Sequence, residues 1–311
     1  MALNIIFMGT PEFAVPILNS IFKSDHKILQ VYTQPPRKKN RGQKINISQV
    51  HKFSIENKID VSHPETFDDE EVKKILNLNP NVVVVVAYGK ILPAKLLDNS
   101  KIKFINIHAS LLPKWRGAAP IQRALMNLDK ETGVSIMKIL PKLDTGPVMM
   151  QSKIKIDKKT DFERLSNTMA LLSAKMILQS LDLIEKRKAK FVPQDETKAT
   201  YATKLEKKEY LIDWNDDSEK VAAKIKALYP KPGSWFLFKG SRIKVLKVEE
   251  VKAKGNPGEI IKSNFTIACG SNAVRLLEIQ KEGKKRMSID DYLKANNLKV
   301  GFNVKKKLLI T

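Results

Sequence analysis

The chain has 311 residues and a formal net charge of +23, and 42% of its residues are apolar. This length and apolar content predict about two domains, each with its own hydrophobic core. The single cysteine, Cys269, excludes an internal disulfide, and no apolar run approaches the roughly 20 residues that span a bilayer. The N-terminus lacks a secretion-signal pattern, so we expect a cytoplasmic protein with no membrane partner.

The first 190 residues alternate strand-like and helix-like patterns. Five consecutive valines follow Asn81, which is typical of a strand buried on both faces of a parallel sheet. Thr10, Pro11 and Glu12 have the residue types of a helix N-cap and first turn. Strands are predicted at 3–7, 27–33, 81–87, 104–108, 133–140 and 147–156, and helices from Thr10 onward and at 47–57, 69–78, 119–128 and 161–186. The alternation predicts a doubly wound, mostly parallel α/β sheet.

The pattern changes near residues 191–203. Beyond them, short strand-like runs stand at 235–238, 242–248, 258–261, 265–268 and 274–277, with helical patterns at 218–228 and 288–296. Short strands broken by Gly, Asn and Pro predict a small β-barrel. We therefore expect an α/β domain over 1–190, a linker over 191–203 and a β-barrel domain over 204–311.

The positive charge has two readings. It favours a polyanionic partner such as nucleic acid, and it also fits a compositional preference for Lys over Arg. Residues 1–200 carry +12, from 32 basic and 20 acidic side chains, and residues 201–311 carry +11, from 24 basic and 13 acidic ones. The second part is therefore the more positive per residue.

Two polar residues interrupt the apolar strand at 104–108. Asn106 and His108 point to one face, because side chains alternate along a strand, and His108 stands at the strand end where ligands bind in open α/β sheets. An amide at Asn106 can donate to a developing oxyanion, and Asp144, in a loop after another strand, can orient an imidazole. A hydrogen-bonded core histidine is the competing interpretation, and spacing alone leaves both open.

Several chemistries lack their motifs in this chain. It contains neither Gly-x-Gly-x-x-Gly nor Gly-x-x-x-x-Gly-Lys-[Ser/Thr], which disfavours nicotinamide and ATP binding. The serine-hydrolase elbow Gly-x-Ser-x-Gly is also missing. The four histidines, His26, His51, His63 and His108, have no metal-ligand spacing, so we expect no metal site.

A basic segment over 34–46 follows the second strand and holds five basic residues and no acidic one. Such a run is commonly a solvated loop. Because it follows a strand on the side of the expected active site, it is also a candidate for ordering on phosphates. Its candidate nucleic-acid ligands are Arg37, Lys38, Arg41 and Lys44.

Four segments together resemble the methionyl-tRNA formyltransferases, within the wider folate-dependent formyltransferase family. They are Met-Gly-Thr-Pro-Glu-Phe-Ala at 8–14, Ala-Tyr-Gly-Lys-Ile-Leu-Pro at 87–93, Asn-Ile-His-Ala-Ser-Leu-Leu-Pro-Lys-Trp-Arg-Gly-Ala-Ala-Pro-Ile-Gln at 106–122, and Leu-Asp-Thr-Gly at 143–146. The Asn-x-His…Asp trio marks the wider family, and the long third segment, the basic loop and the C-terminal barrel narrow the resemblance. The similarity covers the whole chain.

The resemblance implies a Rossmann-like catalytic domain and an OB-like, tRNA-binding C-terminal domain. It implies 10-formyltetrahydrofolate as the formyl donor and the amino group of methionyl-initiator tRNA as the acceptor, for translation initiation. Asn106, His108 and Asp144 are the implied catalytic residues, and Arg41 is the implied contact to the tRNA acceptor end. The implied donor-binding residues are Tyr88, Gly89, Ile91, Leu92, Ser110, Leu111, Leu112, Pro113 and Leu140. We expect a monomer.

Two other functions compete with this one. A formyltransferase for a small amine, such as an amino sugar nucleotide or a purine precursor, would need neither the basic segment nor a C-terminal domain carrying +11. A non-catalytic RNA-binding protein would have no need of Asn106, His108 and Asp144 together.

Overall fold

The computed structural model describes residues 2–39 and 44–305. The chain divides into two compact units. The first contains Met1–Pro120, Glu131–Ile154 and Ser166–Ala202, and the second contains Ile121–Lys130, Lys155–Leu165 and Thr203–Thr311. The second unit thus includes two short segments from within the predicted α/β domain at 1–190, which no local sequence pattern indicates.

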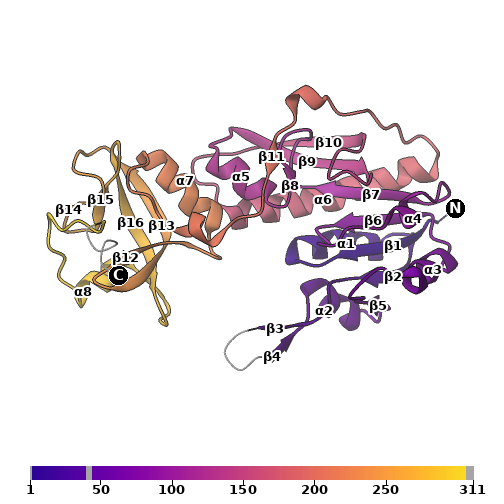
Figure 1. Ribbon diagram of the computed structural model, residues 1–311, viewed down its shortest axis with the longest axis horizontal. Helices are drawn as coiled ribbons and strands as arrows, with labels where there is room; N and C mark the ends of the chain where they lie inside the picture. The colour runs from indigo at the N-terminus through magenta and orange to yellow at the C-terminus, as the bar shows by residue number, and fades with distance from the viewer. Residues whose placement is uncertain (1, 40–43, 306–311) are drawn as a thin grey trace. The chain divides into compact units, whose positions relative to one another are not determined.

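A seven-stranded sheet forms the centre of the first unit, in the order β10-β9-β7-β6-β1-β2-β5 (Figure 1). β1 pairs in parallel with β2 and β6, β6 with β7, and β2 with β5, whereas β7 and β9 are antiparallel. The strands are β1 (Asn4–Gly9), β2 (Lys27–Tyr32), β5 (Val61–Ser62), β6 (Val82–Val86), β7 (Lys103–His108), β9 (Glu131–Lys138) and β10 (Val148–Lys155). All five valines of β6 are buried. The predicted doubly wound, mostly parallel sheet is confirmed.

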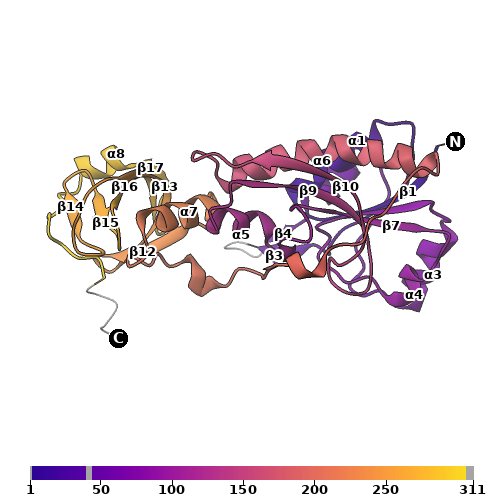
Figure 2. The ribbon, with the colours of Figure 1, turned by 90° about the horizontal axis from the view of Figure 1, so that it is seen from above.

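Helices cover both faces of this sheet. α1 (Val15–Phe22) and α6 (Phe162–Glu185) lie on one face, and α3 (Asp69–Asn77) and α4 (Ala94–Leu97) lie on the other (Figure 2). α2 (Gln49–Glu56) packs against α1. The core beneath α3 and α4 contains Ile6, Met8, Val72, Ile75, Val83, Val85, Leu96 and Phe104. Phe104 belongs to this core. Because side chains alternate along a strand, the even-numbered residues of β7 face α3 and α4.

The predicted N-cap at Thr10 is wrong. The short 3-10 helix η1 (Glu12–Ala14) has Pro11 at its N-cap and no side-chain cap, and α1 begins only at Val15. The Thr10 hydroxyl instead donates a hydrogen bond to the Tyr88 carbonyl at 2.9 Å. The loop after β6 therefore competes successfully for this hydroxyl, and Thr10 joins the loops that follow β1 and β6.

The basic segment also contains more structure than its sequence suggests. β3 (Arg37–Lys39) and β4 (Lys44–Asn46) form an antiparallel pair, with Arg37 opposite Asn46. Three-residue strands without apolar alternation leave no periodic signal, which is why the sequence pattern indicated only a loop. Arg41 lies outside the described residues.

The second unit is built on an antiparallel sheet in the order β12-β13-β16-β15-β14, with β17 paired to β16. Its strands are β12 (Ser234–Phe238), β13 (Ser241–Val251), β14 (Ile260–Lys262), β15 (Thr266–Ala268), β16 (Ala273–Lys281) and β17 (Arg286–Ser288), and its helices include α5 (Pro120–Met126), η3 (Lys207–Tyr210), α7 (Ser218–Leu228) and α8 (Ile289–Lys294). Trp214, Phe236 and Phe265 pack edge to face in its core. The Rossmann-like unit followed by a small β domain confirms the predicted fold class.

Three further short elements belong to the first unit. β8 (Arg116–Gly117) pairs in parallel with β11 (Tyr201–Ala202), and η2 (Glu196–Lys198) precedes β11.

Across the described residues, no helix combines the length and the apolar character that crossing a membrane requires.

Candidate active site

Asn106 and His108 lie toward the carboxyl end of β7, which is an inner strand of the sheet. Asn106 lies between Val85 of β6 and Met137 of β9, and His108 ends β7. The strand order reverses between β1 and β6, and ligands of open α/β sheets bind in the crevice outside such a reversal. The loop at 88–92 follows β6 at this same edge of the sheet. Strand alternation and topology together therefore direct both polar side chains toward the expected binding edge.

The three predicted catalytic side chains converge around Asp144. Asn106 Nδ2 lies 3.4 Å from Asp144 Oδ1, and His108 Nδ1 lies 3.6 Å from Asp144 Oδ2. The side chains of His108 and Asp144 are 6% and 11% exposed. An amide, an imidazole and a carboxylate therefore share one nearly buried space, where electrostatic interactions are stronger than in water.

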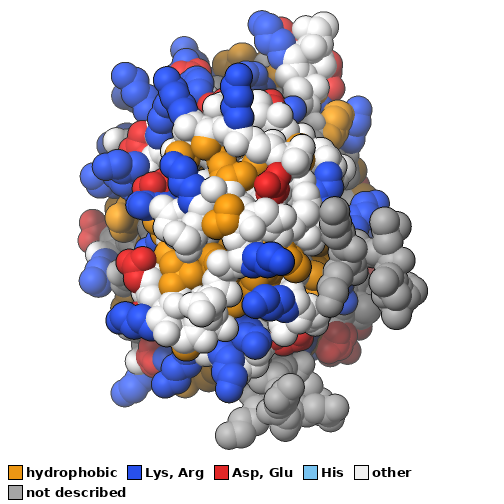
Figure 3. All heavy atoms as spheres, turned by 90° about the vertical axis from the view of Figure 1, so that its left-hand side faces the viewer, with side chains coloured by type: hydrophobic (Ala, Val, Ile, Leu, Met, Phe, Trp, Pro, Cys, Tyr) orange, Lys and Arg blue, Asp and Glu red, His pale blue; other side chains and the backbone are white. Residues whose placement is uncertain are grey.

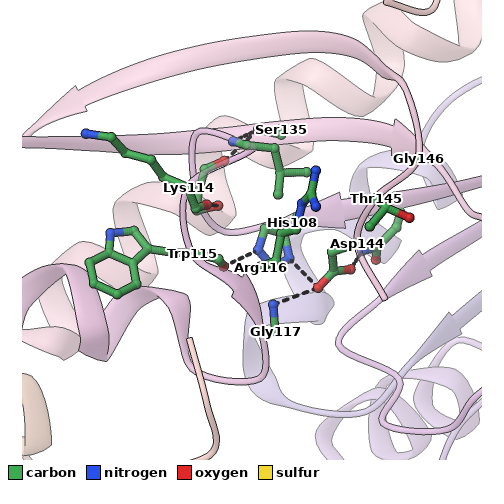
Figure 4. A network of polar contacts seen from close by, with 12 residues as sticks. His108, Lys114, Trp115, Arg116, Gly117, Ser135, Asp144, Thr145 and Gly146 are labelled. Atoms are coloured by element: carbon green, nitrogen blue, oxygen red, sulfur yellow. Dashed lines mark hydrogen bonds and ion pairs between the residues drawn. The ribbon is translucent and has the colours of Figure 1, made fainter. Parts of the chain in front are cut away.

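The Trp115 carbonyl determines which nitrogen of His108 faces this space. His108 Nε2 lies 2.8 Å from that carbonyl oxygen, and a dashed line marks this contact in Figure 4. A carbonyl oxygen only accepts hydrogen bonds, so Nε2 carries a proton and donates the hydrogen bond. The ring nitrogen beside Asp144 is therefore Nδ1, which carries a second proton only when the ring is an imidazolium.

Backbone groups hold the Asp144 carboxylate in place. The Gly117 amide donates a hydrogen bond to Asp144 Oδ2 at 2.9 Å (Figure 4). Asp144 itself has a φ of 51°, in the left-handed region that few non-glycine residues adopt. At Gly146, an added Cβ would lie 1.8 Å from the Lys138 carbonyl oxygen. The turn that carries Asp144 is therefore constrained on both sides of the carboxylate.

Hydrogen bonds to buried hydroxyl groups fix the conformation of the predicted donor-binding segment at 110–113. Ser110 Oγ donates to the Lys114 carbonyl, and Ser135 Oγ donates to the Ser110 carbonyl, both at 2.6 Å. The Leu112 amide donates to Ser135 Oγ at 3.0 Å. Ser110 and Leu112 are buried, whereas Leu111 and Pro113 are partly exposed. The hydroxyl of Ser110 thus shapes the loop from within.

The other predicted donor-binding residues divide between core and surface. Tyr88 is 1% exposed, and burial raises the pKa of its phenol. Leu92 is buried too, whereas Ile91 is 89% exposed and Leu140 is also exposed. Gln34 Nε2 donates to the Tyr88 and Gly89 carbonyls, which fixes the turn at Gly89. The side chains of Tyr88 and Leu92 therefore belong to the core, which leaves their backbone groups as the candidate donor contacts.

Comparison with known proteins gives the family. Residues 3–181 match the formyl transferase family model, and residues 204–297 match the model of the formyl transferase C-terminal domain. The chain belongs to the formyl transferase family. A protein named methionyl-tRNA formyltransferase, from Pelagibacter ubique (strain HTCC1062), is 46% identical over 307 residues, which cover 98% of this chain and 99% of that protein. The resemblance found in the sequence is confirmed.

Two solved structures share the fold. HypX from Aquifex aeolicus, in complex with tetrahydrofolic acid, aligns with a TM-score of 0.64 at 16% identity and covers 94% of this chain and 47% of HypX, so this chain spans about half the length of HypX. A methionyl-tRNA formyltransferase from Clostridium thermocellum aligns with a TM-score of 0.53 at 20% identity, over 81% of this chain and 95% of that one.

Three of the four predicted tRNA contacts of this formyl transferase lie in the β3–β4 pair. Arg37 is exposed there, Lys38 and Lys44 lie on its two strands, and Arg41 lies outside the described residues.

Among the described residues, no group of three or more His, Cys, Asp or Glu side chains could hold a metal ion.

Sequence reasoning missed several groups that contact the site. The Trp115 carbonyl and the Gly117 amide are backbone atoms, so the residue types carry no sign of their role. Gln194, whose amide reaches the carbonyls of Asp144 and Gly146, comes from the segment that the sequence indicated as a linker. Trp115 and Gly117 lay within the motif at 106–122, but that motif was singled out for its resemblance and not for these contacts.

Proposed function

We propose that this chain transfers the formyl group of 10-formyltetrahydrofolate to the free amino group of methionyl-initiator tRNA. The convergence of Asn106 and His108 on Asp144 is the observation that carries the proposal. The folate substrate supplies an activated formyl group, and the transfer forms a C–N bond to the amine while the C–N bond to folate breaks. A proton moves from the amine to the folate nitrogen, so atoms and charge balance.

Asn106 and an imidazolium at His108 donate hydrogen bonds to the formyl oxygen as it gains negative charge. Their distances to Asp144, 3.4 and 3.6 Å, exceed the roughly 2.7–2.9 Å of charge-assisted hydrogen bonds, so both donors remain available to an incoming oxygen. The Trp115 carbonyl holds the ring, so Nδ1 is the donor. Removing one such donor typically costs on the order of 100- to 1,000-fold in rate.

Asp144 has two roles in this mechanism. Its charge stabilises the imidazolium beside it, and its lone pairs hold the water that carries the proton from the amine to the folate nitrogen. The Gly117 amide keeps Oδ2 in place, while Oδ1 lies toward Asn106. The carboxylate therefore serves orientation and proton transfer from one fixed position.

The backbone of 110–113 and the loop at 88–92 form the donor site, with Ile91 and Leu140 as its exposed apolar side chains. The first two segments follow β7 and β6 at one edge of the sheet, whereas Leu140 follows β9, which is antiparallel to β7 and ends opposite Ile105. The loops are fixed internally by Ser135 and Gln34, so a flat aromatic ring system meets surfaces that need no rearrangement.

The basic surface of the chain supports tRNA as the acceptor. Lys and Arg side chains surround the face of the second unit that Figure 3 shows, with apolar side chains between them. Exposed cations of this unit include Lys204, Lys207, Lys208, Lys284, Lys285 and Arg286. Phosphate contacts from such residues position RNA without reading its sequence. Arg37 and Lys38 of β3, Lys44 of β4, and Arg41 then contact the acceptor end.

We also propose that the protein acts as a monomer in the cytoplasm. The chain carries Asn106, His108 and Asp144 in one unit, so no second copy is needed to complete the trio. Sedimentation equilibrium at micromolar concentration gives the mass of a single chain if this holds, and a dimer mass contradicts it.

The test is a formyl-transfer assay with purified protein and 10-formyltetrahydrofolate. Acceptors are methionyl-initiator tRNA, methionyl-elongator tRNA, free methionine and a nucleotide-linked amino sugar. We expect formylated product on initiator tRNA, and its rate falls steeply with salt because a polyanion is bound. Preferential formylation of the amino sugar would replace the proposed acceptor, and no formylation of any acceptor would refute the enzyme function.

A further inference from the structure

Arg116 is a fully buried charged side chain that lies next to the catalytic trio without joining it. Its exposure is 0%, and its guanidinium forms a forked pair with Glu196 at 2.9 and 2.7 Å. Its Nε and Nη2 donate to Gln194 Oε1 at 3.0 and 2.8 Å. A buried guanidinium is tolerated only with such a full set of acceptors, so its position is fixed.

Arg116 determines how the amide of Gln194 is oriented. A guanidinium only donates, so Gln194 must turn its oxygen toward Arg116 and its NH2 group away. That NH2 donates to the Asp144 carbonyl at 2.9 Å and to the Gly146 carbonyl at 2.7 Å. Both amide protons therefore hold the turn in which Asp144 has its left-handed φ of 51°.

The residues on either side of Arg116 contact the trio directly. The Trp115 carbonyl accepts from His108 Nε2, and the Gly117 amide donates to Asp144 Oδ2. The segment 115–117 is in turn bound by the chain after Gln194. The Arg116 amide donates to the Thr200 carbonyl at 2.9 Å, and β8 pairs with β11. An added Cβ at Gly117 would lie 2.8 Å from the Ala202 carbonyl oxygen.

We propose that Gln194, oriented by buried Arg116, is a positioning residue that fixes the Asp144 carboxylate for formyl transfer. This inference rests on the proposed function of the site. The support formed by Gln194 and by the backbone at 200–202 is then part of the catalytic apparatus, whereas the side chain of Asp195 lies outside it. It touches no reacting atom and acts through the carbonyls of Asp144 and Gly146 and through residues 115–117. Its contribution is to kcat, because it holds the geometry of the trio and not the substrates.

Gln194→Glu tests this with a nearly isosteric change. A carboxylate at 194 satisfies Arg116 even better than the amide, so the buried charge stays paired. It cannot donate to the carbonyls of Asp144 and Gly146, and it repels them. We expect kcat to fall on the order of 100-fold, the size of effect that a misplacement of about 1 Å produces, with both KM values within about twofold.

Asp195→Asn is the matched control. Asp195 is the next residue, and among the described residues its side chain contacts only its near neighbours Thr197 and Lys198, at the exposed surface. We expect this variant to keep the native kcat. Thermal unfolding verifies that both variants are folded. If Gln194→Glu does not fold, Gln194→Asn takes its place, because its amide adds no charge and is one carbon too short to serve Arg116 and the carbonyls of Asp144 and Gly146 together.

A second readout does not depend on activity. The imidazole signals of His108, assigned by their loss in His108→Ala, should shift in Gln194→Glu and stay unchanged in Asp195→Asn, because Asp144 moves relative to Nδ1 only in the former. This NMR result separates the positioning proposal from the proposed reaction, since it is obtained even if no acceptor is formylated. Native kcat together with unshifted His108 signals in folded Gln194→Glu would overturn the proposal.

Discussion

Replacing Asp144 by Asn perturbs the site with almost no change in side-chain size. Asp144 Oδ1 lies 3.4 Å from Asn106 Nδ2, and Oδ2 accepts the Gly117 amide at 2.9 Å and faces His108 Nδ1 at 3.6 Å. The carboxylate thus meets donors on both of its oxygens. An asparagine offers one oxygen and one NH2 group, so one of these neighbours must lose its acceptor.

The two orientations of the new amide are not equivalent. If its oxygen faces Asn106, its NH2 group meets the Gly117 amide, a backbone donor that cannot rotate. If its oxygen faces Gly117, its NH2 group meets Asn106, whose amide can rotate and present its oxygen. The second arrangement leaves no clash between donors, so we expect Asn106 to turn its Nδ2 away from the formyl oxygen in Asp144→Asn.

The expected loss combines two effects. Losing the Asn106 donor costs about 3–4 kcal/mol of transition-state stabilisation. The attraction between a carboxylate and an imidazolium at 3.6 Å ranges from about 1 kcal/mol in water to about 5 kcal/mol at an effective dielectric constant near 20. The net gain is about 1–3 kcal/mol, because desolvation of the two nearly buried charges offsets part of this attraction. The sum of about 4–7 kcal/mol corresponds to a loss in kcat of about 1,000- to 100,000-fold.

Single-turnover formylation of methionyl-tRNA measures this loss, and the KM for the folate donor should stay within about threefold because the donor loops are untouched. A double-mutant cycle tests the rotation of Asn106. Asn106→Ala should cost about 100- to 1,000-fold in the native background and less than about tenfold beside Asp144→Asn. Asp195→Asn is again the control. Additive costs, or a kcat for Asp144→Asn within about tenfold of native, would refute the reasoning.

Three further outcomes follow from other parts of the chain. Arg41→Ala should weaken tRNA use and reduce the slope of log affinity against log salt by about one, and an unchanged slope would remove Arg41 from the interface. Tyr88→Phe should raise the free energy of unfolding by about 1 kcal/mol, because the buried hydroxyl of Tyr88 has no hydrogen-bond partner among the described residues. Since burial raises the pKa of Tyr88, the native chain should lose stability as pH rises above about 10. Urea unfolding at neutral pH and above about pH 10 should show a smaller loss of stability in Tyr88→Phe than in the native chain. A variant that is less stable than the native chain at neutral pH would contradict this. Gly146→Ala should lower kcat on the order of 100-fold, because its Cβ would meet the Lys138 carbonyl, while Gly240→Ala, with open space, keeps native activity; equal rates would show that the turn tolerates displacement.

The parts of the fold that the sequence predicted are those with a repeated local pattern. The valines of β6 fill a strand buried on both faces, and the helix expected at 161–186 is observed at Phe162–Glu185. The pair β3 and β4 and the pair β8 and β11 were not predicted, because strands of two or three residues are too short to show any period. Thr10 was misassigned because its residue type fits an N-cap, whereas the carbonyl that it binds, Tyr88, lies 78 residues away.

The candidate catalytic residues of β7 could be identified from the sequence for a related reason. Asn106 and His108 break the apolar alternation of a buried strand, and burying such groups costs several kcal/mol unless they find partners, so local sequence alone marks them. The groups that hold them carry no such mark. The Trp115 carbonyl and the Gly117 amide belong to the backbone, and Gln194 is 50 residues from Asp144. A buried Arg116 demands acceptors, but only the fold shows that Gln194 and Glu196 supply them. A sequence pattern would therefore place Gln194 in a tolerant linker, whereas its contacts predict a defect in kcat, and the Gln194→Glu measurement decides between these two expectations.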